Sequence, residues 1–115
     1  MIRQELPTKL KQLNDLIRKL QDTMEIKGIK VVSLEHSTKI NQFFQNNIPN
    51  IISACQGLLR GEPTEKHELR LAKDFPSVFE NLEKIKELPQ AKEFKETLDQ
   101  IESILKPLSQ IYKEI

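Results

Sequence analysis

The stretch LPTKLKQLNDLIRKLQDTM, residues 6–24, carries an apolar residue at every third or fourth position. A second stretch, AKEFKETLDQIESILKPLSQIYKEI at residues 91–115, has the same spacing up to the last residue. Steps that alternate between three and four keep apolar side chains on one side of an α-helix, and they let helices pack lengthwise with knobs in holes. We therefore expect a long, coiled-coil-like helix at each end of the chain. The two apolar seams are Leu6, Leu10, Leu13, Ile17, Leu20 and Met24, and then Ala91, Phe94, Leu98, Ile101, Leu105, Leu108, Tyr112 and Ile115.

The first half of the chain is expected to hold two helices. The first covers about residues 7–27, because proline suits a first helical turn and Gly28 follows the last seam residue. The second runs from an N-cap at Ser33 to Gly61. Pro49 should bend or break this second helix, because proline has no N–H to donate to the preceding turn.

The second half is expected to be divided by prolines. A short helix covers about residues 65–73, Asp74 resembles a helix cap, and a new helix covers residues 76–88. Pro89 starts the last helix, and Pro107 should kink this helix without ending it, because the apolar spacing continues beyond it. All the connectors are short, and short connections join antiparallel neighbours.

The predicted fold is an all-α antiparallel helical bundle of four to five helices, forming a single domain over residues 1–115. The chain has 115 residues, of which 37% are hydrophobic and 30% charged, with only three glycines. This composition is typical of a soluble, highly helical protein with a real core. We expect no sheet, beyond at most a short extended piece at residues 29–32.

The localisation expected is the cytoplasm. The single cysteine, Cys55, cannot form an internal disulfide, and no apolar stretch begins the chain as a secretory signal would. No membrane segment is expected, because the most apolar region, residues 43–59, is interrupted by asparagine and glutamine.

The feature most informative about function is an uncharged stretch. Residues 36–59 contain one full charge, Lys39, and their polarity comes from asparagine and glutamine. Interface cores are depleted of charge but still need hydrogen bonds. The alternative account is a central helix enclosed by its own bundle.

From this stretch we predict a protein-interaction or assembly subunit, not an enzyme, that presents a helical face to a homo-oligomer or a larger complex. A protein partner or self-association is thus expected. The predicted interaction residues are Phe43, Phe44, Gln45, Asn47 and Ile48, with Ile111, Tyr112 and Ile115 as a second candidate surface.

An alternative function is that of a small helical subunit of a nucleoprotein complex that contacts nucleic-acid phosphates. A net charge of +1 and the lack of basic clusters disfavour tight independent binding, so neighbours would complete such a site. The basic residues available to it are Lys9, Lys11, Arg18, Lys19, Arg60 and Arg70.

A second alternative rests on Arg60 and His67, which are separated by six residues. This spacing resembles the Arg-x(4–6)-His signature of HEPN-type ribonucleases. The resemblance implies a helical bundle whose dimer brings the guanidinium and the imidazole together to cleave RNA. Here Gly61 stands where a polar residue usually follows the arginine, and the pair spans a Gly-Glu-Pro turn. The other account of the pair is a solvated turn and a histidine at a helix N-terminus.

No metal, cofactor or small-molecule ligand is indicated. His36 has no second ligand one turn later, because Ile40 stands there. The carboxylates of residues 80–102 have lysines nearby and are expected to form ion pairs on a solvent-exposed face. Cys55 has apolar neighbours at helical spacing and is expected to be a core thiol.

Overall fold

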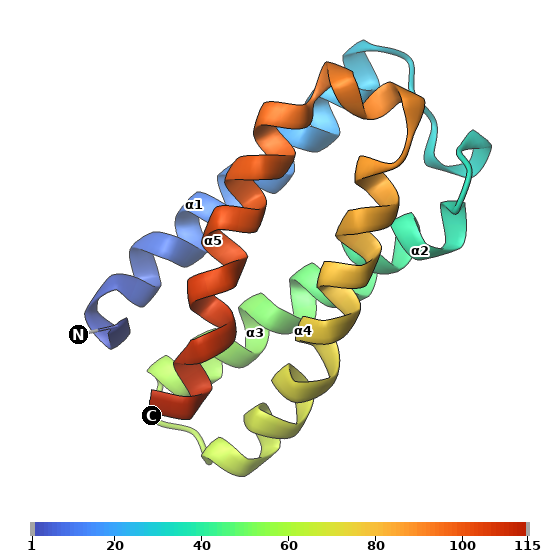
Figure 1. Cartoon of the computed structure of the whole chain (residues 1–115). Helices are drawn as coiled ribbons and strands as arrows, with labels where there is room; N and C mark the ends of the chain where they lie inside the picture. Colours follow the sequence, from blue (N-terminus) through green and yellow to red (C-terminus); the bar gives the residue numbers. More distant parts are fainter. Residues whose placement is uncertain (1, 115) are drawn as a thin grey trace.

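The computed structural model describes the backbone of residues 2–114, and the side chains of that range except residues 2, 3, 64 and 111–114. Within it there is no strand, which confirms the all-α prediction. The elements are α1 (Ile2–Ile26), the 3-10 helix η1 (Val31–Ser33), α2 (Ser37–Gln42), the π turn η2 (Phe43–Asn47), α3 (Ile48–Leu59), α4 (Thr64–Lys86), the 3-10 helix η3 (Pro89–Glu93) and α5 (Lys95–Glu114) (Figure 1).

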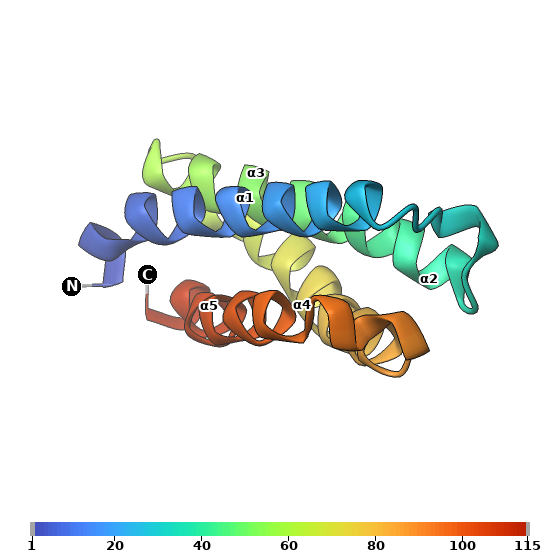
Figure 2. The ribbon, with the colours of Figure 1, turned by 90° about the horizontal axis from the view of Figure 1, so that it is seen from above.

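The helices form two layers. α1 and the α2–η2–α3 segment lie in one layer, and α4 and α5 lie in the other (Figure 2). Contacts between the layers join α1 to α5 and α3 to α4, while α4 and α5 also pack on each other. Each of these neighbours runs antiparallel to the other, so both ends of the described chain lie at the same end of the bundle (Figure 1).

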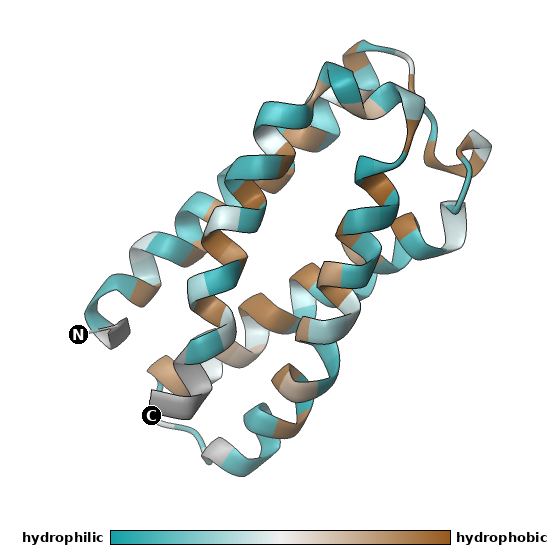
Figure 3. Ribbon diagram, viewed as in Figure 1, coloured by the Kyte–Doolittle hydropathy of each residue, from teal (hydrophilic) through white to brown (hydrophobic). Residues whose placement is uncertain are grey.

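Both apolar seams are in the core. Every seam residue from Leu6 to Met24 and from Ala91 to Leu108 is at most 8% exposed. Figure 3 shows apolar and hydrophilic segments alternating along α1 and α5, as expected for helices with one buried side. Since α1 packs along α5, the two ends of the sequence close one bundle. Tyr112 and Ile115 lie outside the described side chains.

Two predicted boundaries in the first half were wrong. α1 begins at Ile2, so Pro7 lies inside the helix and not in its first turn. The helix ends as predicted before Gly28, whose φ is +69°. Ser33 is not an N-cap, because it belongs to η1, and α2 begins at Ser37 after His36 turns the chain with a φ of 59°.

Pro49 disturbs its helix in a specific way. In η2 the N–H of Ile48 donates to the carbonyl of Phe43, five residues back, and α3 begins with Pro49 in its first turn. The wider π turn therefore lies where proline removes the bond to the carbonyl of Gln45. The predicted break at Pro49 is a local π turn, and the axis continues from α2 into α3 (Figure 1).

The predicted division of residues 65–88 was wrong. α4 is one helix that contains Pro76, and Asp74 is a buried residue inside it and not a cap. The reason is that apolar spacing continues across the proline, where Leu71, Phe75, Val78 and Leu82 are all buried. Packing of this stripe outweighs the one hydrogen bond that proline removes.

The start of the last helix also differs from the prediction. Pro89 opens η3, and α5 begins only at Lys95. α5 then continues through Pro107, as predicted. Lys86 of α4 donates to Glu102 of α5 at 2.9 Å, which adds a polar link at the edge of their interface.

We predict that Leu13→Asp and Ile101→Asp each unfold the chain. Both side chains are fully buried, and an unpaired carboxylate there costs several kcal/mol, a large part of the stability of a small domain. Circular dichroism melts should show loss of the cooperative transition. The matched controls Gln12→Asp and Gln100→Asp, one residue away at exposed positions, should melt close to wild type. A wild-type melt for either buried variant would contradict the assignment of the core.

Candidate functional site

The uncharged helix turns different residues to the core and to solvent. Phe43, Asn47 and Ile48 are at most 3% exposed and lie in the interior of the bundle. Phe44 is half-buried with its ring edge-on to Phe43, at 5.1 Å between centroids, and Gln45 is exposed. The inner face is therefore enclosed by the chain's own bundle. Five interaction residues were predicted on this helix. Phe44 and Gln45 lie at the surface of the folded chain, and the other three lie in its interior.

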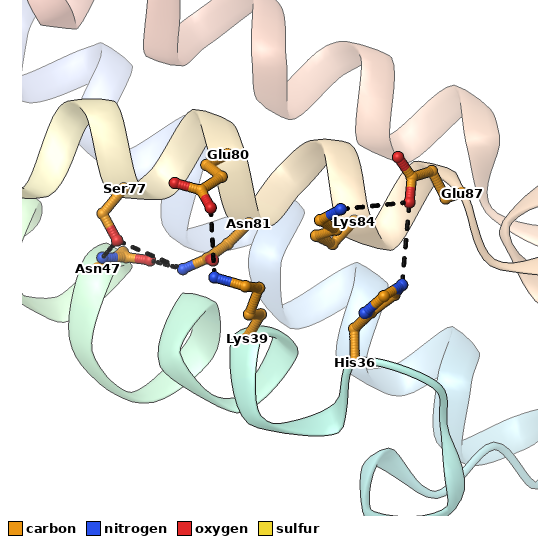
Figure 4. Close-up of polar contacts among 8 residues, drawn as sticks. All are labelled: His36, Lys39, Asn47, Ser77, Glu80, Asn81, Lys84 and Glu87. Atoms are coloured by element: carbon orange, nitrogen blue, oxygen red, sulfur yellow. Dashed lines mark hydrogen bonds and ion pairs between the residues drawn. The ribbon is translucent and has the colours of Figure 1, made fainter.

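A buried polar cluster joins η2 to α4. The amide nitrogen of Asn47 donates to Asp74 Oδ1 and to Ser77 Oγ, both at 3.2 Å. The amide oxygen of Asn47 accepts from Asn81 Nδ2 at 2.7 Å (Figure 4). Asn47, Asp74 and Asn81 are each at most 6% exposed, so these bonds replace the water that the groups have lost. The cluster fixes how α2–η2–α3 aligns with α4.

Ion pairs flank this cluster along the same two helices. Lys39 of α2 pairs with Glu80 of α4 at 3.2 Å, and His36 lies 3.9 Å from Glu87 (Figure 4). The four side chains are 32–62% exposed, so each pair contributes little to the free energy of unfolding. Their arrangement is consistent with a register set by the buried cluster.

We predict that Asn47→Leu lowers the free energy of unfolding by about 2–4 kcal/mol, because the buried Asp74 side chain loses its hydrogen bond and the buried Asn81 amide keeps only a long contact with Ser77 Oγ, at 3.5 Å. Chemical denaturation would measure this loss. Asn46→Leu, on the next and exposed residue, is the control and should change stability by less than about 0.5 kcal/mol. Equal stability of the two variants would show that the cluster does not hold the helices in register.

Two grooves flank the uncharged helix. The first, here called the amide groove, lies toward α4 and has a volume of about 500 Å³. Its lining is polar except for one leucine, and its floor is the buried cluster. The lining residues are Gln42, Asn46, Asn47 and Asn50 on one side, and Leu69, Arg70, Lys73, Asp74 and Ser77 of α4 on the other.

The second, here called the connector groove, lies toward the end of α1 and has a volume of about 320 Å³. Its apolar part is made by Met24, Ile29, Val31 and Phe44, and Gln21, Asn41 and Gln45 contribute amides. The charged residues that line it are Glu25 and Lys30, one of each sign.

A large apolar side chain projects into solvent beside the connector groove. This side chain is Val32 in η1, which is 85% exposed, whereas Ile26, which is 82% exposed, lies on the side of α1 away from the groove-lining Gln21 and Glu25. Val32 lies with Val31 and Asn41 around a neighbouring hollow, so it borders the groove directly. Ile26 falls outside the apolar seam of the first helix, whereas no pattern in the sequence marked Val32 as exposed.

The six basic residues considered for nucleic-acid contact do not form one track. Four lie along α1, Arg60 lies in the turn after α3, and Arg70 lines the amide groove on α4. Arg60 is also paired with Glu62, at 2.9 Å. Contact with nucleic acid stays a prediction from the sequence.

Arg60 and His67 are brought together within one chain by Glu62. Arg60 Nε donates to Glu62 Oε2 and His67 Nε2 donates to Oε1, each at 2.9 Å. The hydrogen bond from Arg60 lowers the pKa of the Glu62 carboxyl the most, and the hydrogen bond from His67 lowers it further. The His67 ring is 5% exposed, and Nδ1 has no hydrogen-bond partner among the described residues. A ribonuclease mechanism needs a ring that RNA can reach, and in this conformation the ring is covered.

Gly57 of α3 leaves the space that this histidine fills. A Cβ atom at Gly57 would lie far inside van der Waals contact of His67 Nε2. The role of Gly57 was not predicted, nor was that of Glu62, because the residues meet only when α3 and α4 form their hairpin.

We predict that the effect of Gly57→Ala on the free energy of unfolding changes sign with the residue at position 67. In the wild-type background it should destabilise the protein by about 1–3 kcal/mol, because it displaces a buried ring. In a His67→Ala background it should stabilise by about 0.5–1 kcal/mol, because alanine favours the helix and the one close neighbour left is Glu62 Oε1, the end of a flexible side chain that no longer bonds the ring. Thermal or urea melts of the four proteins complete the cycle. The same sign in both backgrounds would contradict the steric role of Gly57.

Comparison of the chain with models of protein families, with curated proteins and with solved structures found no match. Across the described residues, no helix combines the length and apolar character needed to span a membrane. Nor do three or more His, Cys, Asp or Glu side chains of that part of the chain gather where they could hold a metal ion. Of the second candidate surface, Ile111, Tyr112 and Ile115, no side chain is described.

Proposed function

We propose that the protein is a non-enzymatic protein-interaction or assembly subunit, and that the connector groove is its docking surface. The observation that carries the proposal is the position of Phe44. This large aromatic is half-buried at the groove, between uncharged amides and near the hollow that the exposed Val32 borders. Exposed apolar groups gathered in one place mark interaction surfaces more often than scattered ones do.

The chemistry of the surface fits the middle of a protein interface. Such regions are poor in charge and rich in aromatic and methionine side chains, and their amides satisfy hydrogen bonds after water leaves. The half-buried Phe44, Ile29 and Val31 supply the apolar contact, and Asn41 and Gln45 supply the amides. Gln45, predicted from the sequence, lies at this groove.

The occupant we propose is a second copy of the chain. The surface holds both a recess, the connector groove, and a projecting side chain beside it, Val32. In a two-fold dimer one surface meets itself, so a recess and a projection on the same patch can each meet the other. Glu25 and Lys30 at the groove carry opposite signs, and a self-contact therefore brings no net repulsion.

We place this subunit in the cytoplasm. Cys55 is free and buried, and burial raises the pKa of its thiol to about 12. A thiol in this state stays protonated and unreactive, as suits a structural cysteine in a reducing compartment.

We predict that Gln45→Lys converts a dimer to a monomer in native mass spectrometry while helicity is retained. A charge pressed into a dry contact costs roughly 2–5 kcal/mol in association when it is unpaired, whereas the same lysine is tolerated in solvent. Val32→Glu should have the same effect from the projecting side. Ser53→Lys, at an exposed position of α3 away from both grooves, is the control and should leave the mass unchanged.

A wild-type protein that stays monomeric at high concentration would overturn the second copy as occupant. Capture of another protein that depends on Gln45 would then move the proposal to a different partner. Because the chain has no tryptophan and one tyrosine, bound nucleic acid would dominate its ultraviolet spectrum. Protein purified without nuclease and carrying such a passenger would favour the nucleoprotein alternative.

A further inference from the structure

We propose that the amide groove is a separate binding site for an extended peptide segment that carries acidic side chains. It lies on the opposite side of the uncharged helix from the connector groove, and it shares no lining residue with it. The proposal therefore goes beyond self-association and can fail or succeed independently.

One wall of the groove is a row of carboxamides. Gln42, Asn46 and Asn50 line it at intervals of four residues, so successive amides lie roughly 6 Å apart along the helix, at about 1.5 Å per residue. Each carboxamide offers donors and an acceptor, the same pair of functions as a peptide group. An extended chain presents alternate residues about 6.7 Å apart, a spacing that side chains of this length can follow.

The opposite wall is cationic. Arg70 and Lys73 of α4 line it, and neither has a carboxylate within ion-pair distance among the described side chains. By contrast, Lys39 and Arg60, which flank the groove region along the chain, are both paired with glutamates. Two cations without partners beside a row of neutral amides favour a ligand with a peptide backbone and carboxylate side chains.

Asp74 does not cancel this charge at the rim. Its side chain is 6% exposed and accepts a hydrogen bond from Asn47 at the floor of the groove. The floor is built from buried, mutually bonded side chains, so the walls are held before a ligand arrives. Such preorganisation lowers the entropy that binding costs. The π turn in this segment belongs to a class of distortions that is frequent at functional sites.

Other ligand classes fit less well. Single-stranded nucleic acid is held by aromatic side chains on which bases stack, and none of the nine lining residues is aromatic. Small-molecule pockets are predominantly apolar, whereas Leu69 is the one apolar side chain of this lining. Leu69 is 76% exposed and is available to an apolar side chain of a peptide.

The test uses the full chain and NMR spectra of its side-chain amides. The probe is a terminally blocked nonapeptide of alternating glutamate and serine, and the matched peptide has glutamine for each glutamate. We expect saturable shifts of the Gln42, Asn46 and Asn50 amide signals with the acidic peptide. The glutamine peptide should bind about tenfold or more weakly, because the charge-assisted bonds are lost.

Two sets of variants test the contributions of the cationic wall and the amide wall to binding separately. Arg70→Glu with Lys73→Glu should weaken binding of the acidic peptide by more than about tenfold. Lys106→Glu, on an exposed position of α5, is the control for charge change and should leave binding unchanged. Gln42→Ala with Asn46→Ala keeps both cations and should weaken both peptides alike, which tests the amides even if the charge-reversed protein folds poorly.

Several results would overturn the proposal. These are no saturable shift with the acidic peptide at millimolar concentration, equal binding of the two peptides, or a response to a uridine nonanucleotide at the same amides with none to the peptide. Native mass spectrometry of the same variants keeps the two proposals apart, because changes in the amide groove should leave the dimer mass as it is.

Discussion

The structure depends on burial of two apolar seams that lie at opposite ends of the sequence. α1 and α5 pack along each other, and every described seam residue on them is nearly inaccessible to water. Neither the first nor the last helix can therefore bury its apolar seam alone, since each covers the apolar surface of the other. This contact closes the bundle, and the segments between them fold back in antiparallel pairs whose connections are short.

The seams could be predicted from the sequence because the spacing of apolar residues alone specifies them. Helix boundaries could not, because proline and capping rules act locally while packing acts over the whole length. At Pro76 the local signals predict a stop with Asp74 as its cap, yet the apolar stripe from Leu71 to Leu82 continues and α4 with it. At Pro49 the local signal predicts a disturbance, and there the chain does adopt a π turn.

The candidate site was visible in outline only. The uncharged stretch marks the right helix, but which of its residues face inward depends on the π turn and on partners far along the chain. Asn47 meets Asp74, Ser77 and Asn81, all at least 27 residues away. Arg60 and His67 were noticed for their spacing, while Glu62 and Gly57, which explain their geometry, carry no signal before α3 and α4 meet.

The absence of charge from this helix follows from its place between two grooves and over a buried carboxylate. A cation at Asn46 or Asn50 would lie beside Asp74 and compete with Asn47 for it, which would loosen the bond that sets the register of α4. An anion there would face Arg70 and Lys73, and would occupy the cations that the amide groove offers to a ligand. Neutral amides avoid both effects and still form hydrogen bonds. The same residue choice thus serves the alignment of the bundle and leaves the groove open, so stability and binding constrain this helix in the same direction.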